Sequence, residues 1–538
     1  MPDGVFPIDG LPRVEGSSIR VSSAGDEVDR WSGGFSFAIW DREQRALRAY
    51  RDHYGARPLY YAARRGRVYL SGDIPSLLGP LTDARLDEIA IAEYLATGAP
   101  TENRTFHDGI ARVPAASLLC VDRNGIRTRR YWNPWDGRWA GRDRPADVDE
   151  EFRRLFRRAV LSCFDGHSFV GFLLSGGPDS SSVLGMAASL CQEGILDPGS
   201  LKTALTLSFE ENADCDEGSL ARETAELWGV RWKAVPIEDI SPLYTMDRFL
   251  EAHGEPPCTA NLAIEMRLFE AARTEGVRVV LDGHDADVLF SPSGSYLSEL
   301  ARGLRWVRLA REVVALRRHH QFTPSRLLRE TLAPLARRHQ RASRVPDWIR
   351  PDLARKTNLR DRMEDASRIG GSFEEREAMR VLTPSVGLSL EATRSMERLC
   401  GIEGRHPYFD PALIRFLVSV PLRHRFQEGA TKILIRRALA DLLTPDVRSR
   451  IRKTNYRPYF DWSLRRHLGR YLESLRDDRG AYIYSILDHS RVSSMISLLL
   501  RGESPNSLAL WRALALDRWV RFRQGQQPED TDEIVHAS

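Results

Sequence analysis

The hydrophobic pattern of the first 135 residues is typical of short β-strands. Apolar and aromatic stretches alternate with Gly, Asp and Arg, a spacing that suits hairpins better than helices. Two stretches, 116–122 and 126–132, flank an Arg-Asn-Gly turn, which is a strong hairpin signal. We therefore predict a β-sandwich, whose earlier strands lie at 33–41, 46–52, 58–63 and 68–73.

The pattern changes near residue 148, where apolar residues begin to recur at helical spacing. Residues 149–164 carry them on one face and charges on the other, which predicts an amphipathic helix. Continuous apolar stretches then alternate with helical ones, as in a doubly wound parallel sheet of the α/β class. The expected strands are 167–177, 200–209, 230–237 and 277–283, and the expected helices are 180–192 and 217–229.

The remaining chain is helical in pattern, with one unusual segment. Between residues 301 and 350 there are 13 Arg, no Lys and only three acids. We interpret 295–380 as an Arg-rich helical insertion, and 526–538 as a polar tail. The predicted domains are therefore a sandwich at 1–140 and an α/β domain with helical additions at 148–525.

Composition narrows the class of protein. The 538 residues carry a formal net charge of +4, with 42% hydrophobic and 28% charged residues, which is usual for a globular chain and argues against a nucleic-acid partner. No apolar run approaches the roughly 20 residues that span a membrane, and the N-terminus lacks a secretory signal pattern. Six scattered Cys without a CxxC pair favour reduced thiols and a cytoplasmic location.

The strongest chemical motif is Leu174–Ser181, between an apolar stretch and a helix. Its two glycines allow a tight turn, and the helix start offers free N–H groups to an anion. Ser175, Ser180 and Ser181 add hydroxyl donors. Asp179 would repel phosphate by itself but suits Mg²⁺ that bridges phosphates. An ordinary capped turn is the alternative; the combined pattern favours nucleotide binding.

This loop resembles the pyrophosphate loop of ATP pyrophosphatases. Residues 33–61 look like the glutaminase domain of asparagine synthetases, an Ntn-hydrolase-like sandwich, and 402–421 with GATKILIRRAL and RIRK look like the end of their synthetase domain. The resemblance covers most of residues 30–460. It implies an ATP-pyrophosphatase fold for the second domain, with ATP and Mg²⁺ as cofactors.

One departure changes the expected chemistry. Asparagine synthetases carry a nucleophilic Cys directly after the initiator Met, whereas here Pro2 follows Met1 and the first cysteine is Cys120. The first domain is thus expected to keep the glutaminase-like fold without its nucleophile. This pattern resembles β-lactam synthetases and lasso peptide cyclases, which adenylate a carboxylate and let an amine of the same molecule close a ring.

The resemblance implies roles for individual residues. Asp179 and Asp287 would bind Mg²⁺, Lys432 would lie near pyrophosphate, and Lys453 would stabilise charge that develops during amide formation, although a surface position is the alternative for Lys453. The nucleotide-binding positions are Leu174, Ser175, Gly176, Gly177, Asp179, Ser180, Ser181, Leu207, Ser208, Asp282, Gly283 and Lys432.

Two further residues have open interpretations. His284 falls where asparagine synthetases have Glu and β-lactam synthetases have Tyr, so it is a candidate base for the attacking amine or, alternatively, a structural hydrogen-bonder. Glu391, 15 residues before His406, occupies the place of the partner acid and would orient His284. The alternative for Glu391 is a solvated helical position.

Among the similar enzymes we favour a lasso peptide cyclase. It would join an Asp or Glu side chain of a precursor core peptide to the N-terminal amine, releasing AMP and pyrophosphate. The expected partners are that peptide, a leader peptidase and a leader-recognition protein. The Arg-rich insertion would be a peptide surface or merely a solvated face; nucleic acid is disfavoured because aromatics are not interleaved. The alternatives are a β-lactam synthetase-like enzyme for a small amino acid and a non-catalytic nucleotide-binding regulatory protein.

Overall fold

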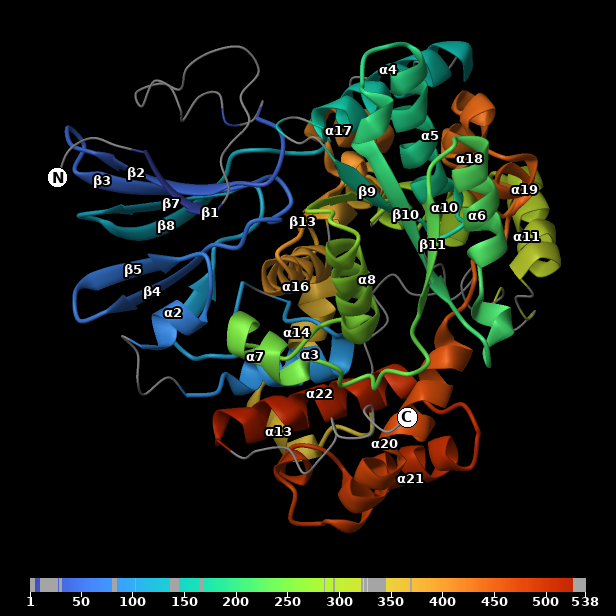
Figure 1. Ribbon diagram of the computed structural model, residues 1–538. Coiled ribbons are helices and arrows are strands. Elements are labelled where there is room, and N and C mark those ends of the chain that lie inside the picture. The colour runs from blue at the N-terminus through green and yellow to red at the C-terminus, as the bar shows by residue number, and fades with distance from the viewer. Residues whose placement is uncertain are drawn as a thin grey trace.

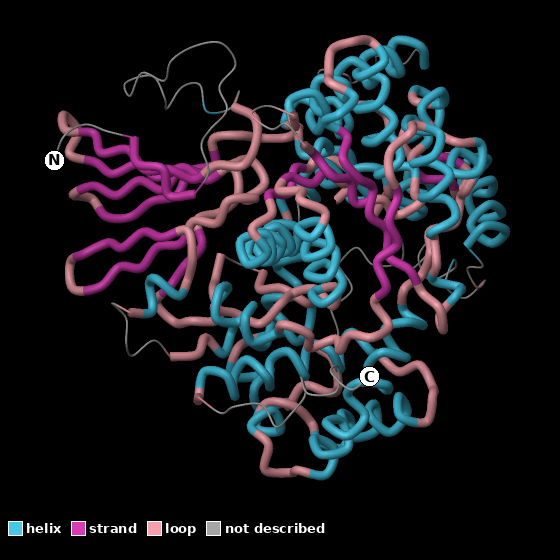
Figure 2. Tube along the Cα trace, viewed as in Figure 1, coloured by secondary structure: helices cyan, strands magenta, loops and turns pink. Residues whose placement is uncertain are grey.

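The structure is a computed structural model in which an antiparallel β domain packs against an α/β domain and a helical layer (Figures 1 and 2). It describes residues 5–9, 28, 31–79, 85–101, 103–135, 145–164, 166, 169–284, 286–293, 296–320, 323, 327, 345–367 and 370–525.

The first domain contains two antiparallel sheets. One has the order β1-β2-β3-β7-β8 and the other the order β5-β4-β6. The strands are β1 (Val5–Asp9), β2 (Ser36–Asp41), β3 (Ala46–Arg51), β4 (Tyr60–Arg64), β5 (Arg67–Ser71), β6 (Ile110–Arg112), β7 (Ser117–Asp122) and β8 (Gly125–Arg130). The hairpin expected around the Arg-Asn-Gly turn is confirmed, because β7 and β8 pair from Asp122 with Gly125 onwards.

Side chains that alternate to one face of each strand pack these two sheets together. Ala38 and Ala49 of the larger sheet pack with Leu59 and Val113 in one apolar cluster. Phe37, the neighbour of Ala38, points to the opposite face and joins a separate aromatic cluster. Figure 1 shows the sheets as two layers, so the predicted sandwich is confirmed.

The second domain is built on a parallel five-stranded sheet with the order β11-β10-β9-β12-β13. Its strands are β9 (Val170–Leu173), β10 (Leu201–Ser208), β11 (Trp232–Pro236), β12 (Val279–Leu281) and β13 (Glu403–Arg405). Taken in chain order this is 3-2-1-4-5, so the direction of winding reverses between β9 and β12. The sequence predicted four of these strands and missed β13, whose three residues include Gly404 and show no strand-like pattern.

Helices cover both faces of the parallel sheet. Val279 and Leu281 pack on one side with the helices α4 and α5, whereas Val280 between them packs on the other side with α8 and α16. The covering helices are α4 (Pro145–Ser162), α5 (Pro178–Gln192), α6 (Gly218–Leu227), α7 (Met246–His253), α8 (Leu262–Thr274), α9 (Ala286–Phe290), α16 (Pro384–Cys400), α17 (Pro411–Ser419), α18 (Ile433–Ala438) and α19 (Pro445–Ser449). The doubly wound arrangement is therefore confirmed.

A layer of helices lies at the base of the molecule in Figure 1. In this layer the C-terminal helices pack with helices from earlier parts of the chain. These are α20 (Arg457–Asp477), α21 (His489–Leu500), α22 (Ser507–Arg523), α3 (Glu88–Thr97), α13 (Pro351–Lys356) and α14 (Leu359–Ser367), while α2 (Pro75–Leu78) lies near α7. Trp511, Trp519 and Leu516 of α22 are fully buried in the same apolar cluster as α3, α7 and α8.

The Arg-rich segment is helical where the structure describes it. It contains α10 (Tyr296–Arg302), α11 (Trp306–His320) and α15 (Phe373–Met379) in addition to α13 and α14. Most of residues 321–344 and the predicted tail at 526–538 lie outside the described residues. Among the described helices, none combines the length and the apolar composition needed to cross a membrane.

Candidate active site

Two loops meet at the point where the sheet reverses its winding. One follows β9 and leads into α5, and the other follows β12. A Cβ atom at Gly283 would lie 2.7 Å from Asp179 Cβ and 2.8 Å from the Ser180 nitrogen, so the close approach of the loops requires glycine. Gly176 has a φ of +63°, and a Cβ there would lie 2.9 Å from the Glu217 carbonyl oxygen.

A cleft of about 950 Å³ opens at this point. Ligands of open α/β sheets generally bind here, beyond the carboxyl ends of the strands. The sequence-assigned residues that line the cleft are Leu174, Ser175, Gly177, Asp179, Ser180, Leu207, Asp282, Gly283, His284, Asp287, Lys432 and Lys453. The structure thus brings together segments that are up to 279 residues apart in the chain, from Leu174 to Lys453.

Four assigned residues lie outside the cleft lining: Gly176, Ser181, Ser208 and Glu391. For Ser181 the expectation of a phosphate-facing hydroxyl is wrong. Its side chain is fully buried and lies 3.4 Å from the Thr224 hydroxyl of α6. Ser180 instead faces the loop, where its hydroxyl accepts a hydrogen bond from the Ser175 nitrogen at 3.1 Å. One residue along a helix turns the side chain to another face, which explains the difference.

Two carboxylates and two ammonium groups meet inside the cleft. The Lys432 amine contacts Asp179 and lies 2.8 Å from Asp287 Oδ1, while the Lys453 amine contacts the other oxygen of Asp287. Burial tends to raise the pKa of Asp287, but Lys432 and Lys453 outweigh burial and lower it to about 2. At Asp179, burial dominates and raises the pKa despite Lys432. The cleft therefore holds charge of both signs in close contact.

The two carboxylates fit a magnesium site that is completed by phosphate oxygens. Asp179 Oδ1 is buried and has no hydrogen-bond partner among the described residues, so it is free to bind a cation. No cluster of three His, Cys, Asp or Glu side chains is arranged for a metal in the described part of the chain. Mg²⁺ commonly binds one or two carboxylates and substrate phosphates, which matches this donor set.

His284 lies beside a second histidine that the sequence analysis used only as a landmark. The ring centroids of His284 and His406 are 5.3 Å apart. His406 Nδ1 is 2.8 Å from Asp282 Oδ1, and the same oxygen accepts a hydrogen bond from the His284 backbone nitrogen at 3.0 Å. Asp282 therefore holds the turn that carries His284, and the ion pair with His406 lowers the pKa of Asp282 although burial opposes this shift.

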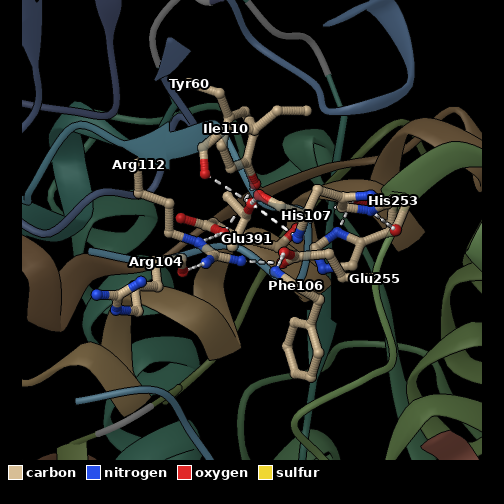
Figure 3. Close-up of polar contacts among 12 residues, drawn as sticks. Tyr60, Arg104, Phe106, His107, Ile110, Arg112, His253, Glu255 and Glu391 are labelled. Carbon is tan, nitrogen blue, oxygen red and sulfur yellow. Dashed lines mark hydrogen bonds and ion pairs between the residues drawn. The ribbon is translucent and has the colours of Figure 1, made fainter. Parts of the chain in front are cut away.

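The expected pairing of Glu391 with His284 is wrong. Figure 3 shows Glu391 at the centre of a cluster between the domains. Its carboxylate accepts hydrogen bonds from Arg51 at 2.7 Å, Tyr60 at 2.8 Å and Arg112 at 2.9 Å. Both oxygens are thus occupied by residues of the first domain. Burial tends to raise the pKa of Glu391, but the two arginines outweigh burial and lower it to about 2.

Sequence reasoning also missed residues that shape the cleft. Arg450 forms an ion pair with Glu217 at 2.6 Å, and the Tyr456 hydroxyl donates to the same carboxylate at 2.8 Å. Arg436 donates hydrogen bonds to the carbonyl oxygens of Val447 and Arg450, which hold the segment before Lys453. The basic motifs around Lys432 and Lys453 marked this region, but their other arginines carried no separate signal.

Comparisons with known proteins agree with this geometry. The Asparagine synthase family matches residues 151–521, and the Glutamine amidotransferase domain family matches residues 21–132. The chain belongs to the asparagine synthase family. The family's synthase region thus contains every element that borders the cleft.

Individual relatives are similar over different lengths. The chain is 28% identical to the amidase chyE of Penicillium rubens over 51% of its own length, and spans only 42% of that relative. It is 22% identical to asparagine synthetase 3 of Bacillus subtilis over 88% of this chain and 74% of that protein. It is also 22% identical to asparagine synthetase 1 of the same organism, over 94% of this chain and 80% of that protein.

Proposed function

We propose that this protein is an ATP-dependent amide synthetase that closes a macrolactam ring in a precursor peptide, as lasso peptide cyclases do. A side-chain carboxylate of the peptide attacks the α-phosphorus of ATP, and pyrophosphate leaves. The N-terminal amine of the same peptide then attacks the acyl carbon, AMP leaves, and the amine gives up a proton. The observation that carries the proposal is the meeting of Asp179, Asp287, Lys432 and Lys453 at the switch point of the sheet.

The residues of the cleft suit separate parts of this reaction. The start of α5 offers unpaired N–H groups to phosphate, and Ser175 and Ser180 add hydroxyls. Mg²⁺ held by Asp179 and Asp287 would neutralise phosphate charge. Lys453 is well placed to stabilise negative charge on the acyl oxygen and the leaving phosphate. His284, held by Asp282, is the proposed acceptor for the proton of the attacking amine.

The borders of the cleft favour a peptide over a small amino acid. The lining includes His319 of α11, so the Arg-rich insertion reaches the cleft. Arg452 donates a hydrogen bond to the His319 carbonyl oxygen at 2.7 Å, which joins the insertion to the segment that carries Lys453.

The first domain has a structural role in this proposal. Its arginines and Tyr60 bind α16 through Glu391, and α16 also carries Thr393, which lines the cleft. The amine comes from the peptide, so no ammonia is needed. A leader peptidase and a leader-recognition protein would supply the free N-terminus in the cytoplasm, within an antibiotic-type pathway of modified ribosomal peptides.

Mass spectrometry of a leader-free core peptide incubated with the protein, ATP and Mg²⁺ tests the proposal. We expect loss of one water from the peptide and one AMP per ring. In the His284→Ala variant, AMP should form in excess over cyclic product, because an activated carboxyl that meets no deprotonated amine is hydrolysed. Cyclic product and AMP at the normal ratio would remove His284 from the mechanism.

A second candidate is amide synthesis on a small amino acid. The similarity to the asparagine synthetases of Bacillus subtilis favours it. Incubation with free aspartate or a β-amino acid in place of the peptide separates the two: product from the small substrate, and none from the peptide, would select this candidate. Absence of pyrophosphate exchange with every substrate would select a non-catalytic nucleotide-binding protein.

A further inference from the structure

A second cavity of about 780 Å³ lies between the first domain and the start of α16. Its lining combines arginines with hydroxyl and amide side chains, and Glu391 is the one acid among the described residues that line it. The arginines are Arg51, Arg104, Arg112 and Arg130, and the neutral polar groups include Thr101, Asn103, Ser117, Thr128 and Thr383. This lining does not overlap with that of the adenylation cleft.

The charge that the cavity offers to a ligand is positive. Glu391 already accepts hydrogen bonds from Arg51 and, as Figure 3 shows, from Arg112 and Tyr60, so it has little capacity to bind a further cation. Arg130 is exposed and forms no ion pair with a described residue, and the Nε atom of buried Arg51 has no acceptor in the described part of the chain. Donors without acceptors in a polar cavity favour an anionic ligand.

One wall of the cavity is an edge strand. β8 is the last strand of its sheet, with no strand beyond it among the described residues, and its side chains are mostly exposed. Thr128 and Arg130 alternate with Arg129, so they share the face that borders the cavity while Arg129 lies on the other face. An edge strand offers backbone donors and acceptors that pair with an extended peptide.

The position of the cavity relates it to the adenylation cleft without merging the two. Gly387, Leu388 and Glu391 of α16 line the cavity, whereas Thr393, farther along the same helix, lines the cleft. Thr393 also donates a hydrogen bond to Glu265 at 3.1 Å on the cleft side. A ligand in the cavity would therefore lie one helix away from the reacting groups.

We propose that this cavity is a docking site for an extended, acidic peptide segment, which pairs with the edge of β8 and places a carboxylate against Arg130. Arg104 already forms an ion pair with Asp87 at 2.9 Å. If the proposed function holds, this segment belongs to the substrate peptide, away from its reacting ends. The volume suits such a segment, since pockets of roughly 300–1,000 Å³ bury most of a drug-sized ligand.

Fluorescence anisotropy with the full chain tests the docking site without ATP turnover. The probe is a fluorescein-labelled hexapeptide of alternating Glu and Thr, and its counterpart carries Lys in place of Glu. Arg130→Glu is the test variant and Arg129→Glu is the matched control, because it makes the same charge change on the opposite face of one strand. Thermal melts and binding of a non-hydrolysable ATP analogue check that both variants are folded.

We expect the acidic probe to bind the natural chain and the Lys probe not to bind. Arg130→Glu should weaken the affinity for the acidic probe by about tenfold or more, equal to about 1.4 kcal/mol of binding free energy. Arg129→Glu should change this affinity by less than about threefold. Equal loss in both variants would mean general attraction to a basic surface and would overturn the proposal. So would equal binding of both probes, binding of neither, or competition by free glutarate as effective as unlabelled peptide.

Failure of this test and failure of the proposed function are distinguishable. Probe binding that depends on Arg130 in a protein that never forms AMP would retain the docking site and reject only the assignment to a substrate. Ring formation without Arg130-dependent binding would retain the proposed function and reject the docking site.

Discussion

The candidate active-site cleft and the cluster between the domains are both built from two cations and two carboxylates, yet they differ in burial and in how many of their polar atoms have partners. In the cluster, Arg51 and Arg112 both bind Glu391. Arg112 also binds one oxygen of Glu255, and the other oxygen of Glu255 accepts a hydrogen bond from the Phe106 backbone nitrogen at 2.6 Å. The exposed fraction of the Glu391 side chain is 1%. In the cleft, that of Lys453 is 73%, and Asp179 keeps an oxygen without a partner among the described residues.

This difference separates a structural from a chemical use of similar residues. The buried carboxylates of the cluster already have hydrogen-bond partners on both oxygens, and removing one of these carboxylates leaves an uncompensated charge. A partly exposed set with an unused oxygen keeps the capacity to exchange partners when phosphate and metal arrive. Substitutions should therefore affect stability in the cluster and chemistry in the cleft.

The largest effect is expected from the two acids that are proposed to bind Mg²⁺. Asp179→Asn and Asp287→Asn should each abolish ATP–pyrophosphate exchange, because each removes a charged oxygen ligand from a cation that prefers carboxylates. Melting temperatures should change little, since Lys432 retains the other carboxylate. Asp352→Asn, at an exposed surface acid, is the control. Near-normal exchange in either variant would contradict the assignment of Mg²⁺ to this pair.

Lys453→Ala should slow ring formation by about 100- to 1,000-fold, the range observed when one preorganised donor to a transition state is lost. Its side chain is largely exposed, so the free energy of unfolding should stay within about 0.5 kcal/mol. Single-turnover kinetics together with denaturant unfolding measure both quantities. Lys356→Ala, at another exposed lysine, supplies the control. A rate of ring formation within threefold of that of the natural protein would show that Lys453 has no role in the reaction.

The cluster should show the opposite response. Glu391→Ala should lower the free energy of unfolding by about 3–5 kcal/mol, because Arg51 and Arg112 lose their common carboxylate while buried. The milder Tyr60→Phe removes one hydrogen bond and should cost about 1 kcal/mol. Protein that remains folded should keep its rate of ring formation per molecule. A Tyr60→Phe variant with unchanged stability but slower ring formation would indicate that Glu391 takes part in the reaction.

The pH dependence of stability is a smaller test of the same cluster. The pKa of Glu391 is about 2 in the folded chain, against an ordinary 4.5, so the carboxylate stabilises the fold above pH 4.5 and this stabilisation is lost as pH falls through 2. The full loss amounts to about 3 kcal/mol. Unfolding curves at pH 6 and pH 3 should differ less in Glu391→Gln than in the natural protein. Identical pH dependence in both would show that Glu391 is not ionised in the cluster.

Much of the fold and of the cleft could be predicted from the sequence because local patterns determine them. The turn between β7 and β8, the glycines after β9 and the helix that begins at Pro178 are short-range features. Asp179 and Asp287 were predicted through motifs at the ends of two strands, which neighbouring strands of a parallel sheet bring together. Ser181 was misplaced, although helical periodicity alone turns it away from Ser180.

The cluster between the domains could not be predicted. Glu391 meets Arg51 and Arg112, which precede it by 340 and 279 residues, and no local pattern marks such pairs. A buried glutamate in an amphipathic helix looks like a solvated one until its partners are known. The strand β13 was missed for a related reason: three residues form a strand only because β12 is there to pair with them.

The central claim is that the cleft activates a carboxylate by transferring AMP to it. The most direct test is to label the ring-forming carboxylate of the core peptide with heavy oxygen and to follow the label by mass spectrometry after ring closure. The account predicts one labelled oxygen in the AMP that is released and none in pyrophosphate. Label in orthophosphate with formation of ADP, or unlabelled AMP, would contradict it.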